Sequence, residues 1–328
     1  MESFIFAVNA VLPLILIVCI GYALRRTGFM SESTPKELNR ILFRFFLPCM
    51  LFVNVYKMEG LADVDFGYIV YAMVAVFVIF FSAIPIVMAV TKSGARRGVL
   101  LQSVFRSNFA LIGLSLVSSL CTNGDSAIAT AALLSAFAIP IFNVFAVVAL
   151  SVFMDSEGGI NVKKILRDVA KNPLIISVIL GVIALLIRSL FVKWGITWRL
   201  SDVGVLFKVL NDLSSISTPI ALLALGAQFK LSAIKGMRRE IIFSVLARLV
   251  VVPSLTLFIA YFFFKFEQAH YASFIALYAT PVAVSSVPMT QEMGGDSELA
   301  GQIVVWTTAV SAITIFLFTF IFKLLGIF

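Results

Sequence analysis

Long apolar stretches follow one another along the chain and are separated by short polar segments. A helix of about 20 apolar residues crosses the roughly 30 Å hydrocarbon layer of a membrane. Stretches of about this length lie near residues 4–24, 39–56, 67–91, 98–120, 127–153, 172–191, 205–228, 240–264, 271–291 and 299–326. The basic pair Arg25 and Arg26 follows the first stretch, which favours a membrane span over an export signal. The pattern therefore predicts an all-α polytopic membrane protein with ten transmembrane helices.

The composition agrees with a chain that is surrounded by membrane lipid. Hydrophobic residues make up 61% of the 328 residues and charged residues 13%, and the mean hydropathy is +1.07. A soluble domain of this size needs far more charge on its surface. The odd number of cysteines, three, and the single histidine, His270, argue against a disulfide framework and a histidine-rich metal centre. No metal and no cofactor are predicted.

Basic residues are concentrated in every second loop. The loops after the first, third, fifth and seventh spans hold fourteen of them, and the opposite loops hold Lys57, Lys193, Arg199 and Lys265. The fourteen are Arg25, Arg26, Lys36, Lys92, Arg96, Arg97, Lys163, Lys164, Arg167, Lys171, Lys230, Lys235, Arg238 and Arg239. Basic loops stay on the cytoplasmic side, so we expect a multi-pass protein of the cell membrane with both termini outside the cytoplasm. The net charge of +8 is a topology signal and does not indicate a nucleic-acid partner.

Two halves of the chain share short motifs at a constant offset. Asn123-Gly-Asp-Ser126 recurs as Gly294-Gly-Asp-Ser297, 171 residues later, and Pro48 and Pro219 have the same offset. Pro13 and Gly21 correspond to Pro173 and Gly181 at an offset of 160. We therefore divide the chain into a first five-helix repeat (1–155), a short amphipathic cytoplasmic connector (156–171) and a second repeat (172–328).

The number of spans in each half determines how the halves are related. Five is odd, so the second repeat starts on the side of the membrane opposite to the first, and the fold is a 5+5 inverted repeat. In transporters that are built this way, the substrate site lies near mid-membrane and is formed by discontinuous helices.

The fourth and ninth spans, which are equivalent in the two halves, both have the composition of broken helices. Residues 277–295 read LYATPVAVSSVPMTQEMGG, with two prolines and five serine, threonine or glutamine side chains, and residues 105–120 read FRSNFALIGLSLVSSL. Lipid cannot satisfy these polar groups, so irregular backbone at this depth has to line a cavity. We predict that the two breaks cross, and that the exposed N–H groups of the following half-helices stabilise an anion such as a carboxylate.

The candidate substrate-binding residues are the polar or helix-breaking positions of these segments and one asparagine of the fifth span. They are Asn108, Gly113, Ser115, Asn143, Thr280, Pro281, Ser285 and Ser286. The structural alternative for the hydroxyl side chains is a hydrogen bond to the carbonyl one turn earlier in their own helix.

Three charged residues within the spans are candidates for gating or for charge compensation. Arg106 can attract the substrate or anchor the helix end, whereas for Arg248 we favour a structural pairing with backbone carbonyls over direct anion binding. Asp212 is the one acid that lies about two turns into a span, and it is the candidate for proton coupling. Coupling to H⁺, coupling to Na⁺ through backbone oxygens, and uniport all remain open.

Several motifs together resemble the auxin efflux carrier family. They are TPVAVSSVPMTQEMGGDSELAGQIVV (280–305), Arg106-Ser-Asn108 before Gly113, NPLIISVILG (172–181), PIALLALG (219–226) and ARLVVVP (247–253). The family includes plant auxin exporters and bacterial permeases associated with malate and malonate, and the chain is most similar to the permeases. The resemblance implies a scaffold of helices 1, 2, 6 and 7, a moving transport domain of helices 3–5 and 8–10, crossing helices 4 and 9, and pairing of scaffolds in a homodimer. It also implies that Asn108 binds the substrate and that Pro281 breaks the ninth span.

Three classes of function are compatible with a membrane-embedded anion site. The leading hypothesis is a secondary transporter that moves small organic anions, such as mono- or dicarboxylates, by alternating access. A membrane-embedded sensor that binds a carboxylate without transporting it is the alternative. An intramembrane enzyme is not supported, because the sequence contains no HExxH motif and no pair of catalytic acids at mid-span.

Overall fold

The computed structural model describes residues 2–57, 66–113, 116–117, 120–121, 124–153 and 162–328. The described chain is helical, apart from one isolated β-bridge between Ser107 and Val282. Its longer elements are α1 (Glu2–Arg26), α2 (Thr34–Ile41), the π-helical turn η1 (Leu42–Phe46), α3 (Leu47–Tyr56), α4 (Phe66–Val90), α5 (Gly94–Phe105), the π-helical turn η2 (Phe109–Gly113), α7 (Gly124–Val152), α8 (Val162–Lys171), α9 (Pro173–Lys193), α10 (Gly204–Gln228), α11 (Ile234–Leu246), the π-helical turn η5 (Ala247–Val251), α12 (Val252–Phe263), α13 (Gln268–Tyr278), α14 (Ser286–Glu292) and α15 (Ser297–Leu324).

Seven helices of the described chain are long and apolar enough to cross a membrane. They are Thr34–Tyr56, Phe66–Val90, Ala127–Val152, Pro173–Lys193, Gly204–Gln228, Ile234–Phe263 and Ser297–Leu324. Each coincides with a predicted span, although the spans predicted at 39–56 and 240–264 begin five and six residues earlier, at Thr34 and Ile234. Helix α1 occupies the first predicted span, and the fourth and ninth are the interrupted helices α5–η2 and α13–α14. The ten-span count and the inverted repeat remain predictions.

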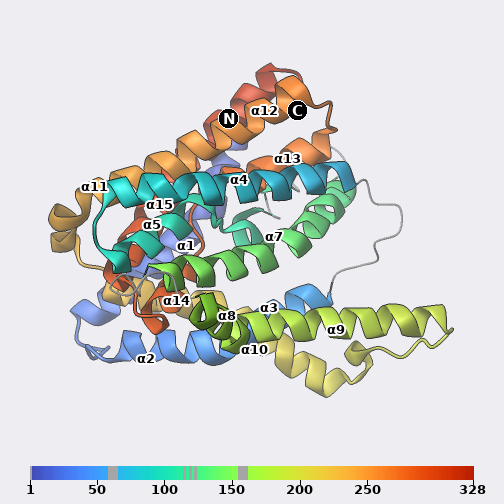
Figure 1. The fold of residues 1–328 in the computed structure, drawn as a ribbon, viewed down its shortest axis with the longest axis horizontal. Coiled ribbons are helices and arrows are strands. Elements are labelled where there is room, and N and C mark those ends of the chain that lie inside the picture. Colours follow the sequence, from blue (N-terminus) through green and yellow to red (C-terminus); the bar gives the residue numbers. More distant parts are fainter. Residues whose placement is uncertain (1, 58–65, 114–115, 118–119, 122–123, 154–161) are drawn as a thin grey trace.

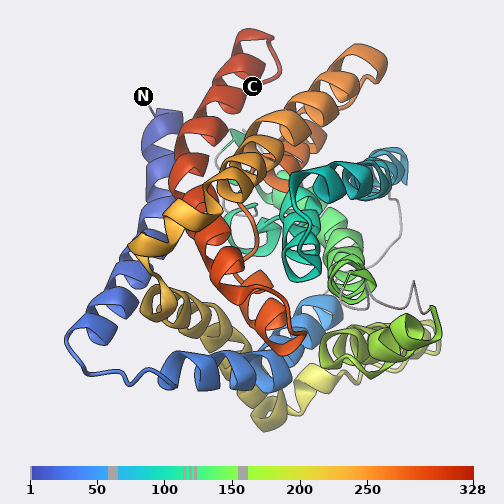
Figure 2. The same ribbon diagram turned by 60° about the vertical axis from the view of Figure 1, so that its left-hand side comes forward.

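Most of the extensive helix contacts fall into two groups, which are joined by packing of α1 against α15 and of α2 against α14. In one group, α1 packs against α10, and α3 packs against both α9 and α10. In the other, α5 packs against α4 and α7, α13 against α7 and α12, and α15 against α11 and α14. Figures 1 and 2 show α2, α9 and α10 below the layer that contains α4, α11 and α12.

Close approach of α1 and α10 depends on two glycines. A Cβ atom on Gly21 would lie 2.2 Å from the carbonyl oxygen of Leu223, and one on Gly226 would lie 2.0 Å from that of Val18. Small residues allow membrane helices to approach until their backbones touch. These glycines therefore fix the α1–α10 contact.

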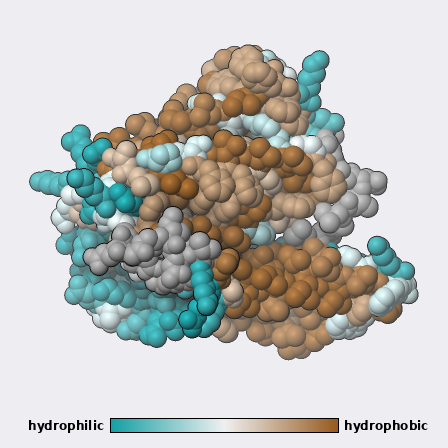
Figure 3. All heavy atoms as spheres, in the orientation of Figure 1, coloured by the Kyte–Doolittle hydropathy of each residue, from teal (hydrophilic) through white to brown (hydrophobic). Residues whose placement is uncertain are grey.

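Hydrophobic and hydrophilic residues separate on the surface. Figure 3 shows a broad apolar flank, whereas hydrophilic residues gather at the left-hand end, where α2 and the start of α11 lie in Figure 1. Along α9, Leu180, Leu186 and Leu190 are among the exposed large apolar side chains. Such a surface is typical of helices that face lipid.

Candidate functional site

The two interrupted helices meet at their interruptions. Helix α5 ends at Phe105 and η2 begins at Phe109, while α13 ends at Tyr278 and α14 begins at Ser286. Within the gaps, Ser107 pairs with Val282 in the antiparallel bridge. The backbone N–H of Asn108 donates to the carbonyl oxygen of Pro281 at 2.8 Å. The predicted breaks and their crossing are thus both present.

Pro281 and Pro288 have different positions relative to the break in the ninth span. Pro281 lies within the gap, where its missing N–H and fixed φ suit an extended backbone. Pro288 lies in the first turn of α14, where the N–H of a helical residue has no partner within the helix. One of the two prolines therefore marks the break, and the other is tolerated in the helix that follows it.

Arg248 joins the ends of both half-helices. Its guanidinium donates to the carbonyl oxygens of Val104 (3.3 Å) and Phe105 (3.2 Å) at the end of α5, and of Leu277 (2.7 Å) and Thr280 (2.9 Å) at the end of α13. The side chain is fully buried. The last carbonyls of a helix have no partner within the helix and carry partial negative charge. Arg248 therefore pairs with backbone carbonyls, as its structural interpretation predicts.

A cavity with about 60 Å³ of free volume lies beside the crossing. A single water needs about 10–15 Å³ of such space, so the cavity has room for a few waters or for a ligand group of similar size. It is lined by Leu47, Met50, Leu51, Asn54, Arg106, Ser107, Asn108, Ile139, Phe142, Asn143, Ser217, Thr218, Ala221, Ala283, Val284 and Ser285. These residues come from both breaks and from α3, α7 and α10.

Arg106 contributes a buried positive charge to the cavity wall. Its side chain is 2% exposed and donates to the side-chain oxygens of Asn143 (2.9 Å), Ser285 (3.0 Å) and Gln102 (3.3 Å), and to the sulfur of Met289 (3.0 Å). All four acceptors are neutral. Among the described residues, no carboxylate lies within ion-pair distance of this guanidinium. A buried charge that has only neutral partners is costly, so an anion in the cavity would be stabilised.

Two further donors in the cavity wall have no hydrogen-bond partner. The hydroxyl of Ser107 and the amide nitrogen of Asn108 are both buried and unpaired. Buried polar groups are normally satisfied. Both residues line the cavity beside Arg106, and polar donors next to a buried positive charge suit a carboxylate.

The other predicted site residues have different environments. The hydroxyl of Thr280 donates to Ala276 at 2.8 Å in its own helix, which is the structural alternative given for such residues. A Cβ atom on Gly113 would lie 2.3 Å from the Phe109 ring, so this glycine serves packing. The described cavity wall does not include Thr280, Gly113, Pro281, Ser286, Arg248 or Asp212. Asp212 is exposed on α10, and Ser115 lies outside the described residues.

The side of the cavity formed by α3 and α10 was not predicted from the sequence. Asn54, Ser217 and Thr218 contribute polar groups there, and Leu47, Met50 and Leu51 contribute apolar ones. Asn54 is an isolated polar residue in an apolar span, and Thr218 closes a short serine-rich stretch (214–218) in another, which was the available signal. Ser107 was also missed, although it lies between two residues that were named.

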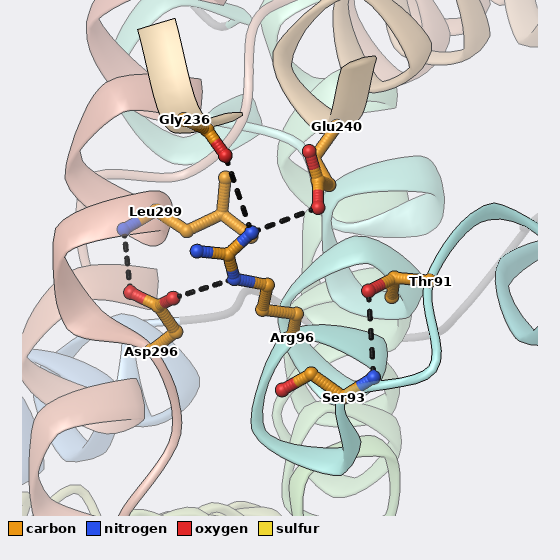
Figure 4. Close-up of polar contacts among 7 residues, drawn as sticks. All are labelled: Thr91, Ser93, Arg96, Gly236, Glu240, Asp296 and Leu299. Atoms are coloured by element: carbon orange, nitrogen blue, oxygen red, sulfur yellow. Dashed lines mark hydrogen bonds and ion pairs between the residues drawn. The ribbon is translucent and has the colours of Figure 1, made fainter. Parts of the chain in front are cut away.

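An ionic cluster fixes the start of α5 at the hydrophilic end of the molecule where α2 and the start of α11 lie, which is called the basic end below. Arg96 donates to Glu240 of α11 at 2.9 Å and to Asp296 at 3.0 Å, and Asp296 also caps α15 by accepting from the N–H of Leu299 at 2.9 Å (Figure 4). Partial burial lowers the pKa of Arg96, but its bonds to the two carboxylates outweigh this effect and raise that pKa overall. The cluster therefore joins the helix that leads to the first break to α11 and α15.

Comparison with protein-family models gives a match over most of the chain. A family model described as a membrane transport protein matches residues 6–319. No curated protein matches the chain. The matched region contains both interrupted helices and all the described residues that line the cavity.

Proposed function

Because the chain belongs to the membrane transport protein family, that of the auxin efflux carriers, we propose that it is a secondary transporter of small organic anions. It is a multi-pass membrane protein and a transporter, not an enzyme. The proposed substrates are mono- or dicarboxylates such as malate, malonate or auxin-like acids. Alternating access would expose the site beside the crossing to each side of the membrane in turn.

The single observation that carries this proposal is the composition of the cavity wall. Arg106 supplies a buried positive charge that is paired only with neutral groups, and the unpaired donors of Ser107 and Asn108 lie next to it in the chain. A carboxylate would compensate the charge and satisfy these donors. With so few donors, the site would bind the carboxylate reversibly, as transport requires.

We also propose that the fold is the ten-span inverted repeat predicted from the sequence. The predicted equivalence of Pro48 and Pro219 pairs Leu47 with Thr218 and Met50 with Ala221, and all four of these neighbours line the cavity. Helix α1, which is span 1, packs on α10, which is span 7; α3, which is span 2, packs on α9, which is span 6. The proposed repeat relates span 1 to span 6 and span 2 to span 7, so it converts each of these contacts into the other. A pseudo-two-fold axis beside the cavity accounts for both observations.

The division into a scaffold and a moving domain follows the two packing groups. Helices α1, α2, α3, α9 and α10 form the proposed scaffold, and α4, α5, α7 and α11 to α15 form the proposed transport domain. The cavity is lined from both groups, so a relative movement would change which side of the site is open. Pairing of two scaffolds in a homodimer remains a prediction.

The hydrogen bonds of Arg248 favour uniport over Na⁺ coupling at the crossing. A cation that bound to the carbonyls of the two helix ends would use those of Val104, Phe105, Leu277 and Thr280, and Arg248 already occupies them. Asp212, the sequence candidate for proton coupling, is exposed on α10 and is absent from the described cavity wall. Both observations support transport that is driven by the substrate gradient and the membrane potential.

Substrate counterflow tests the proposed function. Purified protein in proteoliposomes that are loaded with an unlabelled carboxylate is expected to accumulate the labelled form transiently, with or without a Na⁺ gradient. We expect Asn108→Ala to weaken substrate binding about tenfold, since one hydrogen bond to a charged group contributes about 1.5 kcal/mol or more. Thermal stability measured without ligand should be retained.

The outcomes separate the transporter from the sensor. A carboxylate that stabilises the protein against heat without any counterflow would identify a receptor with this fold. Unchanged affinity in Asn108→Ala would remove this residue from the site. Failure of every carboxylate to bind would contradict the proposal as a whole.

Contacts at the basic end connect the two proposed domains. The side chain of Gln291, at the end of α14, accepts from Asn39 at 3.1 Å and donates to the carbonyl of Lys36 at 3.0 Å. Next to it, Glu292 forms an ion pair with Arg44 at 3.2 Å. The Arg96 cluster, in contrast, lies within the proposed transport domain. Opening of the site at this end would break the Gln291 contacts and leave the Arg96 cluster intact.

We expect Gln291→Ala to favour the state that is open at the basic end. The substitution removes the hydrogen bonds with Asn39 and Lys36 and a longer one from Gln228 (3.5 Å), each contributing about 0.5–1.5 kcal/mol, and would shift the population tenfold or more. A membrane-impermeant thiol reagent added at that side should then label a cysteine placed at Thr218 several-fold faster, in a chain whose three native cysteines are replaced by alanine. Glu298→Ala, an exposed change on α15, is the control and should leave the rate unchanged. Equal labelling rates would show that the Gln291 contacts do not close the site.

A further inference from the structure

The cavity contains a single charge. Among the described residues that line it, Arg106 is the one charged side chain. The undescribed residues nearest the breaks in sequence, 114–115, 118–119 and 122–123, contain no lysine or arginine. The other buried arginine of the crossing, Arg248, is directed at four backbone carbonyls and does not line the cavity.

The rest of the wall is apolar or neutral. Leu47, Met50 and Leu51 form one side, and Ile139, Phe142 and Val284 contribute further apolar surface. Asn54 and Thr218 lie on the side of α3 and α10, where they can form hydrogen bonds with a neutral group. Their side chains cannot neutralise a charge.

These observations predict that the cavity binds monoanions and dianions with different affinities. One carboxylate that binds Arg106, Ser107 and Asn108 leaves the occupied cavity neutral. A second ionised carboxylate would be desolvated among apolar and neutral side chains, and a buried charge without a partner is strongly unfavourable. An apolar or hydroxyl-bearing remainder meets no such cost.

We propose that the site selects organic anions that carry one negative charge and an apolar or neutral remainder, and that it discriminates against dicarboxylates in their dianionic form. This inference rests on the proposed function and narrows its substrate class. In this proposal, the number of negative charges on the ligand determines selectivity more than the size or shape of the ligand does.

Matched pairs of ligands test the proposal. Malonate, succinate and glutarate are each compared with their monomethyl ester in thermal-shift and counterflow competition at pH 7.5, where each diacid is a dianion and each ester a monoanion on the same carbon skeleton. We expect the ester of at least one pair to bind at least tenfold more tightly than the diacid. Diacids that bind as well as their esters, or better, would overturn the selectivity and leave the transporter proposal intact. Binding of neither member in any pair, and of no other carboxylate, would overturn both.

A second positive charge should reverse the preference. Asn54→Lys adds an ammonium group to the part of the wall formed by α3, and Asn54→Gln changes the side chain without adding charge. We expect the ratio of dianion to monoester affinity to rise at least tenfold in Asn54→Lys compared with Asn54→Gln. An equal ratio in two folded variants would overturn the proposal. Should Asn54→Lys fail to fold, Thr218→Lys with Thr218→Gln is the equivalent pair, and the comparison of ligands on the unmodified protein decides by itself.

Discussion

Arg106→Gln is expected to abolish measurable substrate binding and counterflow while the protein stays folded. Loss of a buried, hydrogen-bonded charge partner costs about 2–5 kcal/mol, which weakens binding from about 30-fold to several thousand-fold. The ligand-free protein should melt at nearly the same temperature as the unmodified one. Removal of a buried charge that has only neutral partners favours the folded state, whereas the loss of a donor to Asn143, Ser285 and Gln102 opposes it.

The controls for this prediction separate charge from shape. Arg167→Gln makes the same change at an exposed position of α8 and should affect neither property. Arg106→Lys keeps the charge without the guanidinium fork and should bind with intermediate affinity. Binding that is normal in Arg106→Gln would place the anion elsewhere in the molecule.

The sequence predicted where in the chain the site lies better than it predicted which residues form the site. Apolar length was enough to locate the seven long apolar helices of the described chain, and the polar residues and prolines of 105–120 and 277–295 located the two breaks. These signals are strong because lipid tolerates neither unpaired backbone groups nor charges. Arg106, Asn108, Asn143 and Ser285 could therefore be named before their contacts were known.

The remaining parts of the site depend on geometry that periodicity does not specify. Whether a serine or threonine faces the cavity or its own helix depends on the rotation of a short half-helix, so Thr280 was indistinguishable from Ser285. The wall formed by α3 and α10 arises from contacts between segments far apart in sequence, such as Asn54 with the breaks. Pro288 could not be separated from Pro281, since the exact start of α14 decides which proline is compatible with a helix.

The sequence also left two interpretations of Arg248 open, structural pairing and direct anion binding. In the structure its charge lies between the carboxyl ends of two half-helices, whose partial negative charges compensate it. Arg106 has no such compensation. Arg106 and Arg248 are both buried at the crossing, but only the charge of Arg248 is compensated by its surroundings. We therefore expect the loss of Arg106 to affect mainly substrate binding, and the loss of Arg248 to affect mainly stability.

Arg248→Gln is expected to destabilise the protein before any ligand is added. Glutamine is shorter and has two donors, so at least two of the four carbonyls would lose their partner, and each buried unsatisfied group costs about 1–3 kcal/mol. We expect a clear fall in the melting temperature of the purified protein, with a smaller fall for Arg248→Lys, whose three donors replace part of the network. A stable Arg248→Gln protein that fails to bind carboxylates would instead show that Arg248 holds the anion directly. The ends of α5 and α13 would then need another partner.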